Sequence, residues 1–252
     1  MSVKAPITVT VVVPSRFSSE QLPDFQKEME ARIEEGASVI QLDCSKIEYA
    51  TSSHINALWL VLRMCQQHAA ALKLESPTAQ LIRVLQVMDL YEVFADFGLD
   101  ELGDHTLTSL PTAGQTYDTR FAARLDSLHD VLNQYLVWMQ KIGLSDVDKV
   151  ELQTVFYEVV GNIIEHAGLG DTDMIDFSAL TTEGGLRMVF VDRGIVFDPA
   201  ARAEVIDIGE AARKLQTRGY GLAMISQLVD KMEYERVDDR RNQLTLTRKW
   251  HG

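Results

Sequence analysis

Three polar residues spaced four apart, Glu158, Asn162 and His166, lie within a largely apolar stretch that follows Ser145. In an α-helix this spacing places them in one row, because each side chain lies about one turn above the last. The adjoining apolar side includes three β-branched residues, Val155, Val159 and Ile163. The pattern predicts a helix that is capped by Ser145, runs to about Ala167, and carries a polar row that can point into a pocket.

Two glycine-containing segments follow this helix in the sequence. Asp192 to Pro199 comes directly after a strand-like run, and Arg218 to Leu222 directly precedes an apolar helical run. Glycine lets a backbone approach a ligand closely, and free N–H groups at a helix N-terminus attract phosphate oxygens. Either segment alone is equally typical of an ordinary turn. The order of the three motifs, rather than any one of them, indicates a ligand site.

Further elements are predicted around these motifs. A helical stripe from Phe121 to Met139 ends at Gly143, a residue suited to the left-handed turn after a helix. Strands are predicted at residues 174–180 and 186–192, a helix from Gly221, and a hairpin around residues 239–242.

The N-terminal half alternates strand-like and helix-like segments, which is an α/β pattern. Strands are predicted at residues 7–13, 38–42 and 71–74, with helices at 22–33, at 55–65 and after Pro77. A stretch rich in Gly, Thr, Asp and Pro, residues 98–117, then weakens the pattern. We therefore expect one domain of residues 1–112 and a second of residues 113–252.

Composition limits the classes of function. The formal net charge of -13 leaves no basic face for a nucleic-acid backbone, so direct nucleic-acid binding is not expected. The longest apolar run, residues 9–13, is too short for a membrane helix, and the N-terminus lacks the pattern of a secretion signal. Cys44 and Cys65 suggest neither a disulfide scaffold nor a zinc site. These features predict a cytoplasmic protein without a membrane segment.

The three ordered motifs resemble those of the GHKL ATPase superfamily, and within it the anti-sigma-factor serine kinases. The motifs read Glu-Val-Val-Gly-Asn-Ile-Ile-Glu-His-Ala, Asp-Arg-Gly-Ile-Val-Phe-Asp-Pro and Arg-Gly-Tyr-Gly-Leu-Ala-Met-Ile, and the resemblance covers about residues 121–250. It implies a Bergerat-type α/β sandwich in which ATP lies between helices and a mixed antiparallel sheet.

The resemblance also implies roles for single residues. Glu158 would be the catalytic base, because a carboxylate one turn before a metal ligand can accept the proton of an attacking hydroxyl. Asn162 would bind Mg²⁺ through its side-chain oxygen. Asp192 would accept a hydrogen bond from the adenine amino group, and His166 would be a structural hydrogen-bond partner at the helix end.

Glycines would shape the rest of this nucleotide site. By the same resemblance, Gly194 would admit the adenine ring, while Gly219 and Gly221 would cradle phosphates beneath a lid of about residues 200–218. Val196 departs from the family pattern, which usually has glycine there, and its β-branched side chain can crowd the nucleotide.

Residues 42–55 resemble the strand, loop and helix start of a STAS domain, the fold of anti-sigma-factor antagonists, and about residues 7–108 would belong to it. The resemblance implies a mixed sheet with helices and places Ser53 at the position that is phosphorylated in active antagonists. Thr51, Ser52 or Ser53 would equally serve as a plain helix cap. Thr51 and His54 replace the aspartate and glycine that are usual in the family.

Together the two resemblances predict a regulatory, ATP- and Mg²⁺-dependent protein serine kinase in a bacterial partner-switching pathway. Its partners would be STAS-domain or sigma-factor-like regulatory proteins. Because the two domains share one chain, each is present to the other at around millimolar concentration, which favours an intramolecular contact. A homodimer is compatible with the same pattern.

Two other functions stay open. Val196, Thr51 and His54 favour a non-catalytic interaction module, in which a degenerate ATP fold and a STAS docking platform serve protein binding. ATP hydrolysis without transfer to a protein is the second. A sensor histidine kinase ranks lower, because the sequence shows no dimerising helix hairpin with a phospho-accepting histidine.

Overall fold

The structure is a computed structural model of the 252-residue chain, and it describes residues 6–15, 17, 21–88, 90–98, 111–196 and 220–250. The chain divides into two compact units, Met1–Gly103 and Asp104–Gly252. The first contains a parallel sheet and the second an antiparallel sheet, each with helices, which confirms the α/β class. The domain division at residue 112 stays a prediction.

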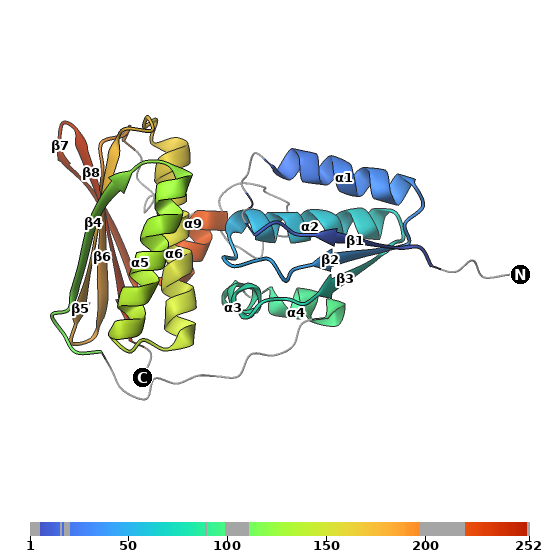
Figure 1. Ribbon diagram of the computed structural model, residues 1–252, viewed down its shortest axis with the longest axis horizontal. Helices are drawn as coiled ribbons and strands as arrows, with labels where there is room; N and C mark the ends of the chain where they lie inside the picture. The colour runs from blue at the N-terminus through green and yellow to red at the C-terminus, as the bar shows by residue number, and fades with distance from the viewer. Residues whose placement is uncertain are drawn as a thin grey trace, which may run out of the picture. The chain divides into compact units, whose positions relative to one another are not determined.

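In the N-terminal unit, three parallel strands form a sheet of order β1-β2-β3. The strands are β1 (Thr8–Val12), β2 (Val39–Asp43) and β3 (Ala71–Glu75). Helices α1 (Leu22–Glu34) and α2 (Ser52–Gln67) lie on one face, and α3 (Ala79–Val87), α4 (Tyr91–Phe94) and the short η1 (Ala95–Phe97) on the other (Figure 1). A mixed sheet was predicted for this unit. Among the described residues, its sheet contains parallel strands alone.

Sequence pattern accounts for these elements. Alternation along β2 leaves Ile40 and Leu42 with no exposed surface, so both lie in the core. Helix α1 has a proline in its first turn and buries Phe25, Met29 and Ile33, which recur every four residues. The predicted strands and helices of this half are confirmed to within a few residues, except that α2 begins earlier, at Ser52.

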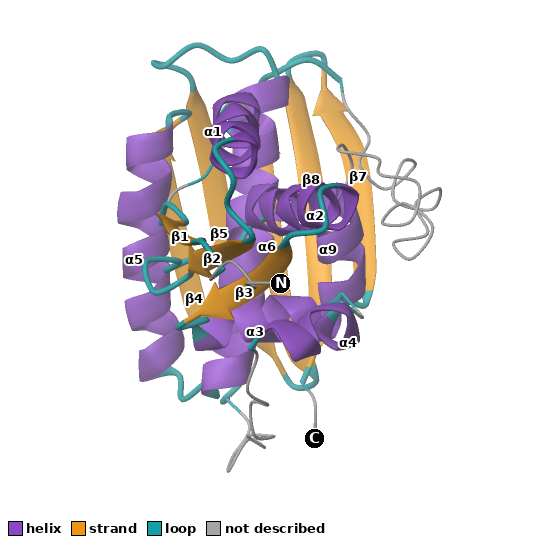
Figure 2. Cartoon of the chain, turned by 90° about the vertical axis from the view of Figure 1, so that its right-hand side faces the viewer, coloured by secondary structure: helices purple, strands orange, loops and turns teal. Residues whose placement is uncertain are grey.

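In the C-terminal unit, five antiparallel strands form a sheet of order β4-β5-β6-β8-β7. The strands are β4 (Thr116–Ala122), β5 (Met174–Thr182), β6 (Gly185–Asp192), β7 (Lys231–Asp238) and β8 (Arg241–Lys249). Helices α5 (Leu125–Lys141), α6 (Asp146–His166) and α9 (Tyr220–Leu228) cover one face of the sheet (Figure 2). The helix that carries the polar row, α6, contacts both of the others.

The ends of α6 follow the sequence signals. Gly143 adopts a left-handed φ of 79° after α5, and the Ser145 hydroxyl accepts a hydrogen bond from the Asp148 amide at 3.0 Å. This helix is confirmed. Phe121 was predicted to begin the stripe of α5, and this was wrong. It lies on β4, where the alternating residues Tyr117, Thr119 and Phe121 are the less exposed ones.

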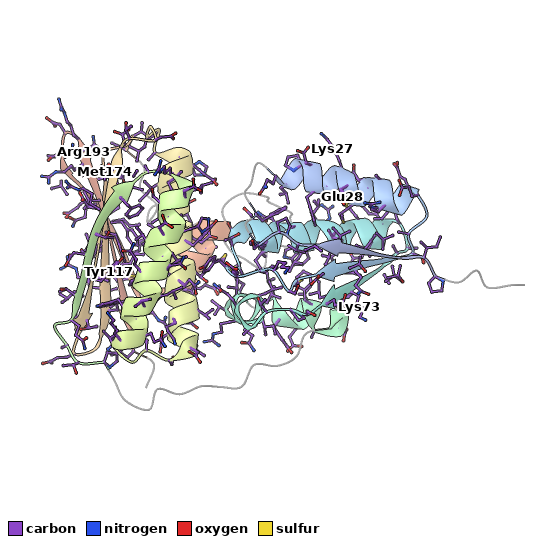
Figure 3. All side chains as sticks on the ribbon, in the orientation of Figure 1. Lys27, Glu28, Lys73, Tyr117, Met174 and Arg193 are labelled. Atoms are coloured by element: carbon purple, nitrogen blue, oxygen red, sulfur yellow. The ribbon has the colours of Figure 1, made fainter. Side chains whose placement is uncertain are left out.

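An aromatic cluster joins the sheet to the helices. The Phe177 ring lies 4.9 Å from that of Phe156 on α6, 5.0 Å from that of Tyr135 on α5 and 4.8 Å from that of Phe190 on β6. Tyr117, labelled in Figure 3, extends the cluster to β4. Such ring contacts add to the burial of apolar area, and they fix α6 on the sheet. The polar row of α6 is thereby held at a defined place.

Among the residues that the structure describes, no helix is both long and apolar enough to cross a membrane.

Candidate functional site

A pocket lies among the C-terminal half of α6, the end of β6, α9, and strands β7 and β8. Its polar lining comes from Asn162, His166, Asp192, Tyr234 and Asn242. Its apolar lining includes Val159, Ile163, Leu222, Ile225 and Leu244. The structure thus brings together Asn162 and Asp192, two of the predicted site residues, in a pocket with apolar walls and few polar groups, which is the usual character of a ligand site.

Asp192 ends β6 and is only 8% exposed. One carboxylate oxygen, Oδ1, accepts hydrogen bonds from the Gly194 amide at 2.7 Å and from Asn242 Nδ2 at 2.8 Å. A buried carboxylate needs such donors, because it would otherwise lose the hydrogen bonds of water. Asp192 is therefore a fixed hydrogen-bond acceptor in the pocket.

Gly194 permits the turn after β6 to pack against the end of α6. A Cβ at this position would lie 2.4 Å from the Ala167 carbonyl oxygen and 2.5 Å from the Ala167 Cβ, closer than real contacts allow. The next amide, of Ile195, donates to the same carbonyl at 2.9 Å. Within the described residues, this close packing is the reason that position 194 requires glycine. The role of Gly194 in admitting an adenine ring stays a prediction.

Glu158 and Asn162 lie beneath the first turn of α9. A Cβ at Gly221 would lie 2.3 Å from Glu158 Oε2, so any larger residue would displace this carboxylate, and 3.6 Å from Asn162 Nδ2, an ordinary contact distance. Glu158 is 6% exposed, whereas Asn162 Nδ2 is buried without a hydrogen-bond partner in the described part of the chain. A buried amide without a partner is costly, and a bound ligand would satisfy it.

The other predicted features of the nucleotide site are His166, Val196, and Gly219 with the lid. His166 lines the pocket, but its side chain is 58% exposed, and its Nε2 lies 3.9 Å from Glu165 Oε2. Val196 is 65% exposed at the end of the described segment. Gly219 and the lid of about residues 200–218 lie outside the described residues.

No sequence pattern pointed to Asn242, Tyr234 or Arg236, yet Asn242 and Tyr234 line the pocket and Arg236 donates a hydrogen bond to Asn242. Asn242 pairs with Asp192 across strands β6 and β8, and it receives hydrogen bonds from Tyr234 and Arg236 on β7. A prediction of strand register would have been needed to find them, because their sequence positions lie more than 40 residues from Asp192.

In the N-terminal unit, Ser53 occupies the first turn of α2. Thr51 precedes the helix and forms a capping box with His54: the Thr51 amide donates to His54 Nδ1 at 3.1 Å. His54 Nε2 is 3.0 Å from the Pro14 carbonyl oxygen. Thr51 is only 4% exposed, whereas Ser53 is half-buried and makes no side-chain hydrogen bond within the described residues. Of these two hydroxyls, that of Ser53 is the more available.

His54 predicts a pH dependence of stability for this unit. Burial lowers its pKa to about 4, although the hydrogen bond to Pro14 opposes the shift. Between pH 6.5 and 4, the unfolded state binds a proton at this histidine that the folded state does not, so stability falls as the pH falls through this range. We expect His54 to account for a loss of about 3 kcal/mol. Urea unfolding followed by the fluorescence of Trp59 would measure it.

The control for this prediction is His54→Gln, which has no group that titrates in this range. Its free energy of unfolding should depend less on pH between 6.5 and 4 than that of the parent. Equal slopes in the two proteins would contradict the role assigned to His54.

The C-terminal unit thus has helices on one face of an antiparallel sheet and a pocket lined by both, and it follows a parallel α/β unit. Residues 121–248 match the family of the histidine kinase-like ATPase domain, and residues 2–99 match the Mlab, STAS domain. The first match spans more than half of the 252 residues, so the chain belongs to the histidine kinase-like ATPase domain family, and it carries a STAS domain as well. An ATPase domain indicates ATP as its ligand.

Two solved structures are similar at low identity. A crystal structure of the RsbU and RsbW domains of a Mycobacterium tuberculosis protein is 21% identical, with a TM-score of 0.38, over 54% of this chain and 32% of that chain. The SiaB-SiaC complex from Pseudomonas aeruginosa is 12% identical, with a TM-score of 0.40, over 52% of this chain and 88% of that chain. This chain thus covers about a third of the first structure. No curated protein matches the sequence.

Proposed function

We propose that the C-terminal unit binds Mg-ATP and transfers its terminal phosphoryl group to a serine of a STAS domain, as a regulatory kinase in a partner-switching pathway. The observation that carries the proposal is the placement of Glu158 and Asn162 beneath the first turn of α9, next to a pocket that contains Asp192. The family match supports the nucleotide, and the geometry supports its orientation.

The residues present fit an adenine nucleotide. Asp192 offers a fixed carboxylate to an amino group, and the apolar side chains of Val159, Ile163 and Leu222 suit a flat ring. At the other end, Gly221 lies in the first turn of α9, where the free N–H groups of a helix N-terminus favour phosphate. The adenine ring would therefore lie near Asp192 and the phosphates near Gly221.

Magnesium also fits, as an ion that the protein and the phosphates would bind together. Among the described residues, no group of three His, Cys, Asp or Glu side chains could hold a metal ion by itself. Mg²⁺ is commonly bound by one or two protein oxygens together with phosphate oxygens and water, so the single amide oxygen of Asn162 suffices. When bound, the ion would offset the charge of the phosphates.

Glu158 would act as the general base. Its carboxylate is buried beside the first turn of α9, one helical turn before Asn162, so it lies next to the place proposed for the phosphates. There it can accept the proton of an attacking hydroxyl while Asn162 orients the phosphate end of the nucleotide. Positioning and charge stabilisation account for most of the catalysis in phosphoryl transfer.

The acceptor hydroxyl that we propose is Ser53, or the corresponding serine of a separate STAS-domain partner. Ser53 has a free hydroxyl at the start of α2, and a phosphate there would lie near the free amides of the helix N-terminus. Thr51 is a poorer acceptor because the capping box occupies it. Sigma-factor-like regulatory proteins, an intramolecular STAS contact and a homodimer are the other partners that we propose.

A second candidate is a non-catalytic interaction module. Two observations favour it: Val196 replaces a glycine of the motif and presents an exposed β-branched side chain, and His54 replaces the glycine beside Ser53. In that case the ATPase fold would bind a protein partner and transfer no phosphate.

Nucleotide binding separates the two candidates. A ligand at one hundred times its Kd should raise the free energy of unfolding by about 2.7 kcal/mol, provided that it binds the folded state alone. We expect Mg-ATP to raise the melting temperature of the parent. For Asn162→Ala we expect the Kd for Mg-ATP to be at least about tenfold higher, because the variant lacks one charge-assisted contact. A thermal-shift titration measures both.

The matched control is Gly161→Ala, one residue away on α6. A Cβ at Gly161 would meet nothing within 4 Å, so this change should keep nucleotide binding. If Mg-ATP shifts neither the parent nor the control, the kinase proposal fails and the interaction module is supported.

A further inference from the structure

Three residues on neighbouring strands meet at the end of the pocket. Asp192 on β6 pairs with Asn242 on β8, and Asn242 pairs in turn with Arg236 on β7. The register of β7 against β8 shifts between Arg236 and Asp238, which marks a β-bulge or irregularity beside the site. Bulges re-aim side chains, and they are frequent next to functional sites.

Asn242 uses both ends of its amide in this arrangement. Its Nδ2 donates to Asp192 Oδ1 at 2.8 Å, and it lies 3.2 Å from the carbonyl oxygens of both Gly194 and Ile195. Its Oδ1 accepts from the Tyr234 hydroxyl at 2.7 Å and from Arg236 Nη1 at 2.6 Å. The residue is 3% exposed and its hydrogen-bonding capacity is occupied, so it supports the pocket rather than offering a free group to a ligand.

Arg236 extends this support to the backbone. Its Nη1 also lies 3.3 Å from the Gly194 carbonyl oxygen, and its Nη2 donates to the Asp239 carbonyl oxygen at 2.5 Å. The guanidinium therefore joins the β7–β8 hairpin to the turn that follows Asp192. Because it is charged, it also polarises the Asn242 amide and strengthens the hydrogen bond that this amide donates to Asp192.

We propose that Asn242 and Arg236 are positioning residues that fix Asp192 and thereby set the base selectivity of the site. This inference rests on the proposed nucleotide site. Asp192 Oδ1 already accepts from Gly194 and Asn242, whereas Oδ2 accepts no hydrogen bond within the described residues. A carboxylate oxygen held in this orientation accepts from an amino group and repels a carbonyl oxygen, so it selects a 6-amino purine over a 6-oxo purine.

The test compares Mg-ATP with Mg-inosine triphosphate, whose base has an oxo group at C6 in place of the amino group and a hydrogen on N1, in the full chain. The variants are Arg236→Met and Asn242→Leu. The control is Arg241→Met on the same hairpin, whose side chain pairs with Asp238. We expect the ratio of the two affinities to fall about tenfold in both variants and to stay unchanged in the control. Calorimetric titration gives each Kd.

A second readout needs no nucleotide. In the apo protein, the Gly194 amide donates to Asp192, so loosening the turn should speed its exchange with deuterium by about tenfold in both variants and not in the control. Parent protein that binds neither nucleotide would refute the proposed function, and unchanged exchange would refute the positioning role. Faster exchange with an unchanged affinity ratio would overturn the selectivity that we assign to the pair.

Discussion

Glu158→Gln is expected to slow phosphoryl transfer from Mg-ATP to a STAS-domain serine by about 10²–10⁴-fold, the usual contribution of a general base. Glutamine has the same shape as glutamate, so it should still fit beneath the first turn of α9, where a Cβ at Gly221 would lie only 2.3 Å from Glu158 Oε2. Binding of Mg-ATP should therefore change little. Incubation with labelled ATP measures the transfer. The same assay with Ser53→Ala tests whether Ser53 is the acceptor.

Glu165→Gln is the matched control, because it removes a carboxylate from the same helix at its more exposed end. It should transfer phosphate at close to the parental rate. If Glu158→Gln loses nucleotide binding as much as transfer, the carboxylate has a structural role in seating α9 and is not the base. Release of phosphate without any labelled protein would instead indicate simple ATP hydrolysis.

Local sequence patterns predicted much of this fold. The Ser145 cap and the spacing of Glu158 and Asn162 predicted α6, because a helix cap and a helical period depend on residues a few positions apart. The alternation of strands and helices in the N-terminal half was predicted for the same reason. Placement of Asn162 and Asp192 in one pocket followed from the order of the motifs, which carries information on the fold as a whole.

The features that the sequence did not predict depend on contacts between distant segments. Phe121 fits a helical stripe with Leu125, and only pairing with β5 makes it part of a strand. Asn242 follows a charged turn and resembles an ordinary hairpin residue, and only the register of β6 against β8 places it beside Asp192. Arginine is usually exposed, yet Arg248 is only 1% exposed.

Arg248 is also the residue whose loss should most destabilise the C-terminal unit. Its Nη2 lies 2.7 Å from Asp148 Oδ1 and forms a second ion pair with Glu151, and all three side chains are at most 5% exposed. Removal of the arginine takes from two buried carboxylates the positive charge with which both form ion pairs. We expect Arg248→Met to lower the free energy of unfolding by about 3–5 kcal/mol, as is usual when one partner of a buried ion pair is lost.

The charges themselves, rather than the loss of packing, should cause this effect. Adding Asp148→Asn and Glu151→Gln to Arg248→Met removes the two buried carboxylate charges, so the triple variant should regain a large part of the lost stability. Arg187→Met, at an exposed position on β6, should change the free energy of unfolding by no more than about 0.5 kcal/mol. Urea unfolding followed by the fluorescence of Trp138 and Trp250 would report on this unit. If the single and triple variants were equally unstable, the buried arginine would contribute through its packing, and the ion pairs would not explain its burial.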